Sequence, residues 1–276
     1  MSAPVITFLS DYGVRDEFVG VCHGVIARRC PQAQVIDITH TIARHDVRAG
    51  ALVLRNALTY MPPGVHLSVV DPEVGAIGTH ARRAVAIEVA EEGRVLVGPD
   101  NGLLGLAAER FGGAVEAVDI GRSCERLEPV SATFHGRDIF APVAAAIAAG
   151  AKLFTVGEPL PVEELNSVEL PSAFAHEGGL ATHALYVDHF GNVTLDATYE
   201  QLGAIGLRLG ATLRVEIDGR VYPARYAPTF AGVGVGELLL YEDAQRMTAL
   251  AINRGSAAET LGVERDDRLL IRAEEA

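Results

Sequence analysis

The chain has 276 residues, of which 49% are hydrophobic, and its formal net charge is −13. This length allows two domains with a sizeable core, and the negative charge argues against nucleic acid as a partner. No segment reaches the roughly 20 apolar residues of a membrane span. The N-terminus lacks the basic and apolar regions of a secretion signal. Three cysteines without a Cys-x-x-Cys pair indicate reduced thiols in a cytoplasmic protein.

The first 150 residues alternate short apolar strands with amphipathic helices. Strands are expected at residues 5–9, 34–38, 65–70, 84–89 and 95–97, and helices at 16–29, 46–60 and after residue 102. This alternation predicts an α/β domain with a mostly parallel sheet. Polar turns containing Asp11, Asp71 and Asp100 follow three of the strands. Because parallel strands end at one edge of a sheet, we expect these turns to lie together around a ligand crevice.

Residues 133–142 place three chemically capable side chains next to a glycine, before a run with helical spacing that ends at Gly150. Asp138 is predicted to cap this helix by accepting backbone N–H groups. His135 and Arg137 would then project from the preceding loop, where α/β domains often carry binding groups. A capped helix with a buried histidine and a surface arginine explains the same segment equally well.

The second half of the chain is predicted to be mostly strand. Short strands are expected at residues 182–187, 212–217, 220–226, 237–241, 248–252 and 267–271, which predicts a small antiparallel β-barrel. A segment containing proline, glycine and acidic residues precedes it. We therefore expect an N-terminal α/β domain at 1–165, a linker at 166–179 and a C-terminal β-barrel domain at 180–276.

Two turns of the second half combine groups suited to a purine nucleoside. The turn from Asp188 to Asn192 contains a carboxylate, the Phe190 ring and an amide, which together offer stacking and polar contacts. The turn around Asn253 and Gly255 exposes backbone groups that can read the edge of a base. Each turn by itself is also explained as an ordinary bend of the chain.

Taken in order, six motifs resemble the S-adenosylmethionine hydroxide adenosyltransferase family, which belongs to the superfamily of the fluorinases and chlorinases. They are Ser10-Asp11-Tyr12-Gly13 with Asp16, Asp71-Pro72, Asp100-Asn101-Gly102, Phe134-His135-Gly136-Arg137-Asp138, Asp188-His189-Phe190-Gly191-Asn192 and Asn253-Arg254-Gly255-Ser256-Ala257. The resemblance covers nearly the whole chain. It implies a homotrimer that holds S-adenosylmethionine between the first domain of one subunit and the second domain of its neighbour. It further implies attack of water at the ribose C5′, which releases adenosine and methionine without a cofactor.

The same resemblance assigns roles to individual residues. It implies that the reaction centre consists of Asp71, Arg82 and His135. The residues implied to bind the substrate are Asp11 at the ribose diol, Asp188 at the amino group of the methionine part, and Phe190, Asn192, Asn253 and Gly255 around the adenine. Either the carboxylate or the imidazole of the reaction centre could act as the base. No metal site is expected, because the sequence has no HExxH or comparable cluster.

The chain departs from the family pattern between its third strand and Arg82. Glu73 stands where the family usually has glycine, and residues 76–78 look like an insertion, so Arg83 is an alternative to Arg82. These departures leave open a non-catalytic sensor of S-adenosylmethionine or adenosine. A halide-dependent halogenase is the third hypothesis. Water is favoured as the nucleophile, because the carboxylate of Asp71 would repel a desolvated halide.

Overall fold

The computed structural model describes residues 3–78 and 81–274. The chain divides into two compact units, Met1–Val168 and Glu169–Ala276, and each unit has its own hydrophobic core. The division falls in the segment where we expected the linker, part of which forms strand β8 (Phe174–His176). Within the described residues, no helix is both long and apolar enough to cross a membrane.

The first unit is built on a seven-stranded sheet in the order β2-β1-β3-β5-β4-β6-β7. Its strands are β1 (Val5–Ser10), β2 (Gln34–Thr39), β3 (Val65–Val69), β4 (Ala84–Val89), β5 (Val95–Pro99), β6 (Ala114–Asp119) and β7 (Glu158–Leu160). Neighbours from β2 to β5 are parallel, whereas β4, β6 and β7 add antiparallel pairings. The α/β fold with a largely parallel core is confirmed. Strands β6 and β7 were not expected from the sequence.

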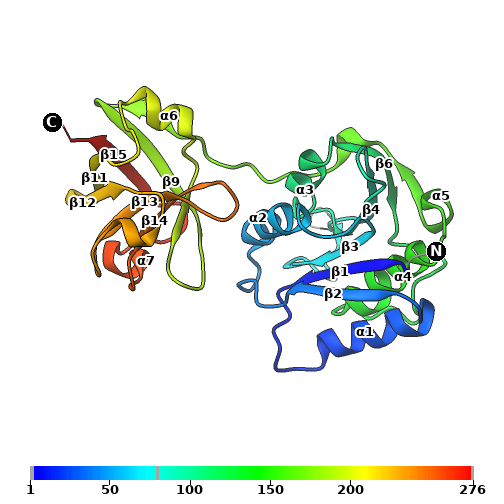
Figure 1. Ribbon diagram of the computed structural model, residues 1–276. Helices are drawn as coiled ribbons and strands as arrows, with labels where there is room; N and C mark the ends of the chain where they lie inside the picture. Colours follow the sequence, from blue (N-terminus) through cyan, green and yellow to red (C-terminus); the bar gives the residue numbers. More distant parts are fainter. Residues whose placement is uncertain (1–2, 79–80, 275–276) are drawn as a thin grey trace. The chain divides into compact units, whose positions relative to one another are not determined.

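Helices cover both faces of this sheet. On one face α1 (Phe18–Arg29) packs against α4 (Ala141–Ala148), and on the other α2 (Val47–Leu58) packs against α3 (Gly105–Arg110) (Figure 1). The short helix α5 (Leu153–Val156) and a 3₁₀ turn (Val162–Glu164) follow α4. Burial of the apolar sides of strands and helices explains why the strand sequences are almost continuously hydrophobic.

The prediction that Asp138 caps a helix is wrong. Asp138 lies inside a π-helical turn (Gly136–Phe140) that continues directly into α4. Its carboxylate accepts a hydrogen bond from the Ser131 N–H at 2.8 Å and pairs with Arg137. The π-turn runs directly into α4, so the Asp138 carboxylate does not cap that helix. It holds the loop before His135 instead, through the Ser131 N–H. Single π-helical turns are frequent at functional sites.

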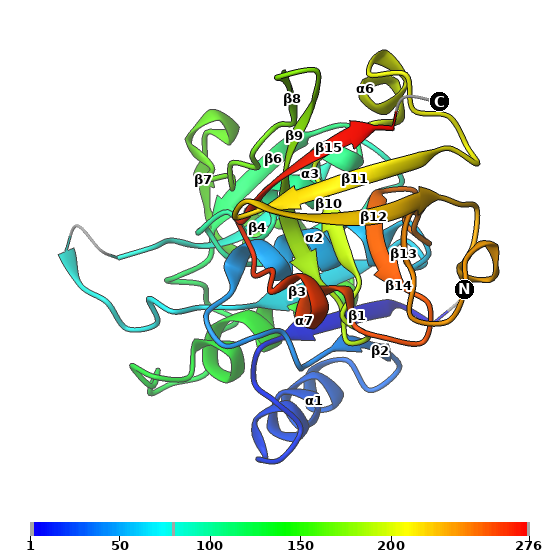
Figure 2. The same ribbon diagram turned by 90° about the vertical axis from the view of Figure 1, so that its left-hand side faces the viewer.

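The second unit is a closed barrel. Its strands after β8 are β9 (Gly179–Val187), β10 (Val193–Leu195), β11 (Thr212–Ile217), β12 (Arg220–Tyr226), β13 (Leu238–Glu242), β14 (Thr248–Ile252) and β15 (Arg268–Ala273). The order is β10-β14-β13-β12-β11-β15-β9-β8, and an additional pairing of β10 with β9 closes seven strands into a ring. Figure 2 shows β15, β11 and β12 side by side, as their pairings require. The predicted β-barrel is confirmed.

One pairing makes this barrel mixed rather than wholly antiparallel. Strands β12 and β13 are parallel, because the chain crosses over between them through a 3₁₀ turn (Phe230–Gly232) instead of forming a hairpin. The barrel also has two short helices that the sequence analysis did not predict, α6 (Tyr199–Ala204) and α7 (Ala257–Leu261). By contrast, β11 and β12 form the hairpin that Asp218 and Gly219 indicate, both with positive φ.

Strand β3 of the first sheet contains a buried histidine with two polar partners. His66 on β3 is fully buried between Thr7 and Arg94, with Nδ1 2.9 Å from the Thr7 hydroxyl and Nε2 3.1 Å from Arg94 Nη1. Burial, together with the positive charge of Arg94, lowers the pKa of His66 to about 3. The folded state therefore keeps this imidazole neutral at pH values where the unfolded chain protonates it.

We predict that His66 contributes to acid destabilisation. Between the unfolded pKa of about 6.5 and the folded value of about 3, the unfolded state binds more protons, so stability decreases as the pH falls. The expected contribution is about 1.4 kcal/mol per pH unit in that window. His66→Gln should remove this part of the pH dependence of stability when it is compared with wild type by urea unfolding from pH 7 to pH 4. The control His189→Gln changes an exposed histidine and should leave it in place. Parallel pH profiles for wild type and His66→Gln would contradict the prediction.

Candidate active site

Three of the predicted site residues form one contiguous cluster in the first unit. Arg82 donates from Nε to Asp71 Oδ1 at 3.0 Å, and its Nη2 contacts the other carboxylate oxygen. The same Nη2 lies 2.9 Å from His135 Nδ1. Asp71 follows β3, Arg82 precedes β4 and His135 precedes the π-turn. Residues far apart in the sequence are thus joined at one edge of the sheet by a single guanidinium group.

The cluster is largely removed from water. The side chains of Asp71 and Arg82 are each 6% exposed, and the guanidinium carbon lies 5.3 Å from the centre of the Phe140 ring. A two-pronged arginine–carboxylate pair in such surroundings has a rigid geometry. The pair therefore gives the site a fixed, charge-balanced wall.

The hydrogen bond to Arg82 defines the protonation state of His135. A guanidinium can only donate, so His135 Nδ1 must accept, and the neutral ring carries its proton on Nε2. Burial and the positive charge of Arg82 lower the pKa of His135 and favour the same neutral form. His135 therefore offers an N–H donor on the side of the ring away from Arg82.

The neighbouring arginine has different partners. Arg83 donates from Nε to Asp100 at 2.9 Å and from Nη1 to Glu164 at 2.8 Å. Between Arg82 and Arg83, it is thus Arg82 that contacts Asp71 and His135. Asp100 is 4% exposed and also accepts from the Asn166 N–H at 2.8 Å. Asp100 therefore holds the segment after the 3₁₀ turn and does not join the cluster.

Asn101, which follows Asp100, holds the backbone next to Asp71. Asn101 Nδ2 donates to the Val70 carbonyl at 2.9 Å, at the position directly before Asp71. Asp11, at the end of β1, lies beside the same strand end, because its N–H donates to the Val69 carbonyl at 3.4 Å. The predicted gathering of strand ends therefore holds for Asp11 and Asp71.

Tyr12 lies against Gly136, next to His135, and the sequence analysis gave it no role. An added Cβ at Gly136 would lie 1.9 Å from the Tyr12 hydroxyl, so the glycine leaves the space that this hydroxyl occupies. Burial, with further contributions that include Asp71 and Asp11, raises the pKa of Tyr12 well above its usual value. Tyr12 therefore keeps its proton as a donor. Its position inside the first motif was the available sequence signal.

The two predicted turns of the second unit also lie against each other. An added Cβ at Gly191 would meet the Ser256 hydroxyl at 2.1 Å, and Ala258 N–H donates to the Gly191 carbonyl at 2.9 Å. Asn253 donates from Nδ2 to the Val233 carbonyl at 2.9 Å, and Gly255 bridges back to Ile252. The barrel thus brings together two turns that are about sixty residues apart in the sequence.

Asp188 organises the first of these turns. Its Oδ1 accepts from the backbone N–H groups of Phe190 and Asn192, each at 2.9 Å, and its Oδ2 accepts from Asn192 Nδ2 at 2.8 Å. Asn192 is consequently buried, whereas the Phe190 ring is 74% exposed. The turn therefore presents an aromatic face on a rigid base.

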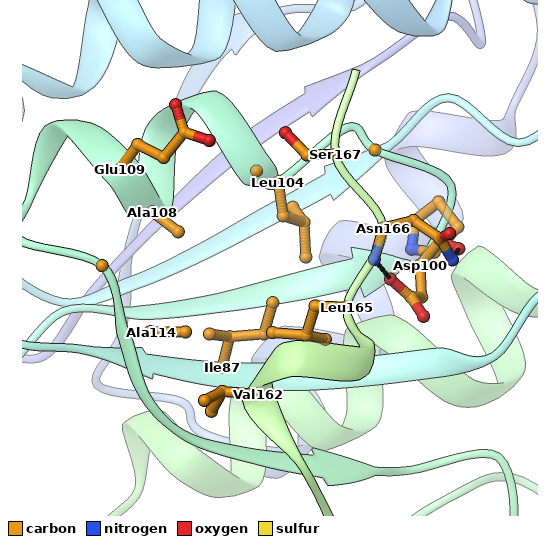
Figure 3. A pocket seen from close by; sticks show the side chains of 14 residues that line it. Ile87, Asp100, Leu104, Ala108, Glu109, Ala114, Val162, Leu165, Asn166 and Ser167 are labelled. Carbon is orange, nitrogen blue, oxygen red and sulfur yellow. Dashed lines mark hydrogen bonds between the residues drawn. The ribbon is translucent and has the colours of Figure 1, made fainter. Parts of the chain in front are cut away.

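A pocket in the first unit lies apart from these residues. It has a volume of about 160 Å³ and is lined mainly by apolar side chains, together with Asp100, Glu109, Asn166 and Ser167 (Figure 3). Its lining includes none of Asp71, Arg82 and His135. Ligand pockets for small molecules usually measure about 300–1,000 Å³, so this space is too small for a nucleoside.

Another group of polar side chains, two histidines and an aspartate, was not singled out by the sequence analysis. Among the described residues, His23, Asp37 and His40 each offer one ligand atom, and these atoms all lie within 4.8 Å of one another. The local signal was the Asp-x-x-His spacing of Asp37 and His40. His23 lies on another element, so only folding brings it to the other two.

An α/β sheet with a buried acid–guanidinium–imidazole cluster, followed by a closed barrel with adjoining polar turns, defines a two-domain class of protein. Residues 6–157 match the model of the SAM hydroxide adenosyltransferase N-terminal domain, and residues 182–270 match that of the C-terminal domain. The chain therefore belongs to the SAM hydroxide adenosyltransferase family.

Individual relatives agree with this assignment. The (R)-S-adenosyl-L-methionine hydrolase of Salinispora tropica is 46% identical over 270 residues, which cover 98% of each chain. A fluorinase of Nocardia brasiliensis is 30% identical over 278 residues, covering 92% of each chain. The crystal structure of an uncharacterized conserved protein from Thermotoga maritima superposes with a TM-score of 0.88 at 33% identity, covering 97% of this chain and 99% of that chain.

The cluster geometry predicts how the pKa of His135 responds to substitution. Arg82 lowers this pKa whereas Asp71 and Asp138 raise it, so Arg82→Gln should raise the pKa of His135. NMR titration of the imidazole signals, assigned with His135→Ala, measures the shift. Arg83→Gln is the matched control, because Arg83 is paired with Asp100 and Glu164, and it should leave the pKa of His135 unchanged. Equal titration of wild type and Arg82→Gln would contradict the proposed contact.

Proposed function

We propose that this protein hydrolyses (R)-S-adenosyl-L-methionine to adenosine and L-methionine by attack of water on the ribose C5′. The observation that carries the proposal is the cluster of the buried Asp71 and Arg82 side chains with the half-buried His135, which lies beside the strand end that bears Asp11. The 46% identity to a named (R)-S-adenosyl-L-methionine hydrolase over 98% of the chain supports the same reaction.

This chemistry requires little beyond alignment and proton transfer. The sulfonium of the substrate is a good leaving group, so no covalent nucleophile is needed, and the site has to hold a water molecule in line with the C5′–S bond. As the C–O bond forms, the attacking oxygen becomes strongly acidic. A carboxylate is then a sufficient proton acceptor.

The donor pattern of the cluster suggests a division of labour. His135 uses Nδ1 to accept from Arg82, which leaves its Nε2–H to donate to the attacking oxygen. Asp71 is the remaining acceptor, and we propose it as the base that receives the proton. Arg82 holds both groups at fixed angles and stabilises the carboxylate until the proton arrives. Tyr12 remains protonated and completes the polar wall as a donor.

We assign substrate binding to the residues named by the family resemblance. Asp11 would accept from the ribose hydroxyls, for which a carboxylate at a strand end is well suited. Asp188 would hold the amino group of the methionine part. Adenine would stack on Phe190 and be read by the adjoining turns, through Asn192, Asn253 and Gly255. The exposure of the Phe190 ring and the contact between the two turns support this role.

We further propose a homotrimer in which the first unit of one subunit and the second unit of its neighbour share each substrate. The distribution of the assigned residues over two compact units supports this arrangement. The reaction uses no metal or added cofactor, and we propose a cytoplasmic location. The three free cysteines are typical of a reducing compartment.

The alternatives fit the site less well. A non-catalytic sensor was suggested by Glu73 and by the apparent insertion at residues 76–78. Both Glu73 and Ile77 are exposed, Ile77 at 91%. The contacts among Asp71, Arg82 and His135 are all present despite these departures. A halogenase must accommodate a desolvated halide, which the buried carboxylate of Asp71 would repel. A halide-dependent 5′-halogenated product would favour that reading instead.

The proposed roles predict different kinetic effects. Asp71→Asn and His135→Ala should lower kcat by roughly 10²–10⁴-fold with smaller changes in substrate binding, the range typical of lost acid–base groups. Asp11→Ala should mainly raise KM. Chromatography for adenosine, with circular dichroism as a folding check, measures these effects. Glu73→Gly, which restores the residue that the family usually has at this position, is the control and should change activity little. Equal losses of binding in all three variants would refute the assignment.

Phe190 provides a separate test of adenine binding. Loss of base stacking costs about 1–3 kcal/mol, so Phe190→Ala should raise KM by roughly 5–150-fold and change kcat less. Phe174→Ala removes another exposed aromatic ring of the same unit and should have little effect on KM. Measurement of both variants by adenosine release, with sedimentation to record the oligomeric state, checks the role. An unchanged KM in Phe190→Ala would exclude stacking on this ring.

A further inference from the structure

A group of two histidines and one aspartate lies outside the proposed reaction centre. His23 on α1 places Nε2 2.9 Å from Asp37 Oδ1 on β2, and His40, directly after β2, places Nε2 3.1 Å from the same oxygen. Both views of the fold show α1 beside β2 (Figures 1 and 2). Three ligand atoms therefore converge from a helix, a strand and the turn that follows the strand.

His40 is the member whose environment lacks a matching partner. Its side chain is 6% exposed, its Nδ1 lies 2.8 Å from the Ser10 hydroxyl, and its Nε2 has no hydrogen-bond partner among the described residues. The contact between Nε2 and Asp37 is close, but it does not have hydrogen-bond geometry. A buried ring nitrogen thus lies close to a carboxylate oxygen without a hydrogen bond to it.

Either neutral form of His40 is unfavourable in this arrangement. If Nε2 carries the proton, a buried donor is left unsatisfied, which is costly. If Nδ1 carries it and donates to Ser10, the unprotonated Nε2 lies 3.1 Å from the negative oxygen of Asp37 and accepts no hydrogen bond from the described residues. A bound cation resolves the second case, because Nε2 and the carboxylate oxygen would then both coordinate it.

We propose that His23, His40 and Asp37 bind a divalent transition-metal cation of the zinc type. Zinc in proteins is bound by imidazole nitrogen and carboxylate oxygen at about 2.0–2.2 Å, which in tetrahedral geometry separates ligand atoms by roughly 3.3 Å. The two histidine–aspartate separations of 2.9 and 3.1 Å need only a slight opening, and all three ligand atoms lie within 4.8 Å of one another. Two imidazoles disfavour Mg²⁺ and Ca²⁺, which prefer oxygen ligands.

The surroundings complete such a site. The hydroxyl of Ser10 accepts from the Tyr12 N–H at 3.3 Å and can also accept from His40 Nδ1–H, the second hydrogen bond that metal-bound histidines typically make. The side chains of His23 and Asp37 are 36% and 41% exposed, which gives a cation access from solvent and leaves a coordination position for water.

The cation would tie together the elements around the Asp11 loop. It would join α1 to β2, which is the edge strand of the sheet. The hydrogen bond between His40 and Ser10 would connect the cation further to the end of β1. The same loop is held by the Gly13 N–H donating to the His40 carbonyl at 2.7 Å and the His45 N–H donating to Asp11 at 3.0 Å. The site therefore stabilises the fold beside the proposed ribose-binding acid and takes no part in the reaction itself.

Zinc titration of the full-length, chelator-treated protein tests the proposal. Calorimetry should show one zinc bound with micromolar or tighter affinity, and zinc should raise Tm by several degrees. His23→Ala and Asp37→Asn, both at partly exposed side chains, should each weaken binding at least 50-fold and remove the rise in Tm. His176→Ala is the matched control, since His176 is also partly exposed and lies 3.7 Å from Glu177, and it should bind zinc as wild type does.

A crystal grown with zinc supplies the direct readout. Anomalous scattering should place the cation about 2 Å from Nε2 of both histidines and from Asp37. The proposal is overturned if wild type binds zinc no more tightly than His23→Ala and Asp37→Asn, or if the anomalous peak lies at other residues. These measurements use no S-adenosylmethionine, so their outcome is independent of the proposed hydrolysis.

Discussion

The buried pairing of Arg82 with Asp71 is the interaction on which the candidate site depends. One guanidinium group binds the carboxylate through two nitrogens and also donates to His135. A desolvated carboxylate without this partner would be strongly destabilising, and an imidazole without it could adopt either neutral tautomer. The orientation and protonation of both groups proposed to act on water therefore follow from the position of one arginine.

The fold positions that arginine by ending several strands at one place. Asp71 follows β3 and Arg82 precedes β4, while Asn101 anchors the carbonyl directly before Asp71. Asp138 holds the loop before His135 from within a π-helical turn, and Gly136 leaves room for the Tyr12 hydroxyl. Several residues with purely structural contacts thus determine the geometry of the few that would meet a substrate.

In the second unit, too, residues with structural contacts hold the groups proposed to bind the substrate. The Asp188 carboxylate accepts three N–H hydrogen bonds from its own turn, which fix the backbone that carries the exposed Phe190 ring. The Asn253 turn is packed against it through Gly191 and Ser256. Rigid turns lower the entropy lost on binding, so a preorganised aromatic face suits the recognition of a flat base.

The sequence was sufficient for the α/β fold, the barrel and the grouping of Asp11 with Asp71, because hydrophobic periodicity and the ends of parallel strands follow from local chemistry. It could not determine that Arg82 rather than Arg83 meets Asp71, that Asp138 sits within a π-turn, or that β12 and β13 run parallel. Nor could it bring His23 to Asp37 and His40. These features depend on contacts between distant segments, whose register and side-chain directions are established only when the core packs.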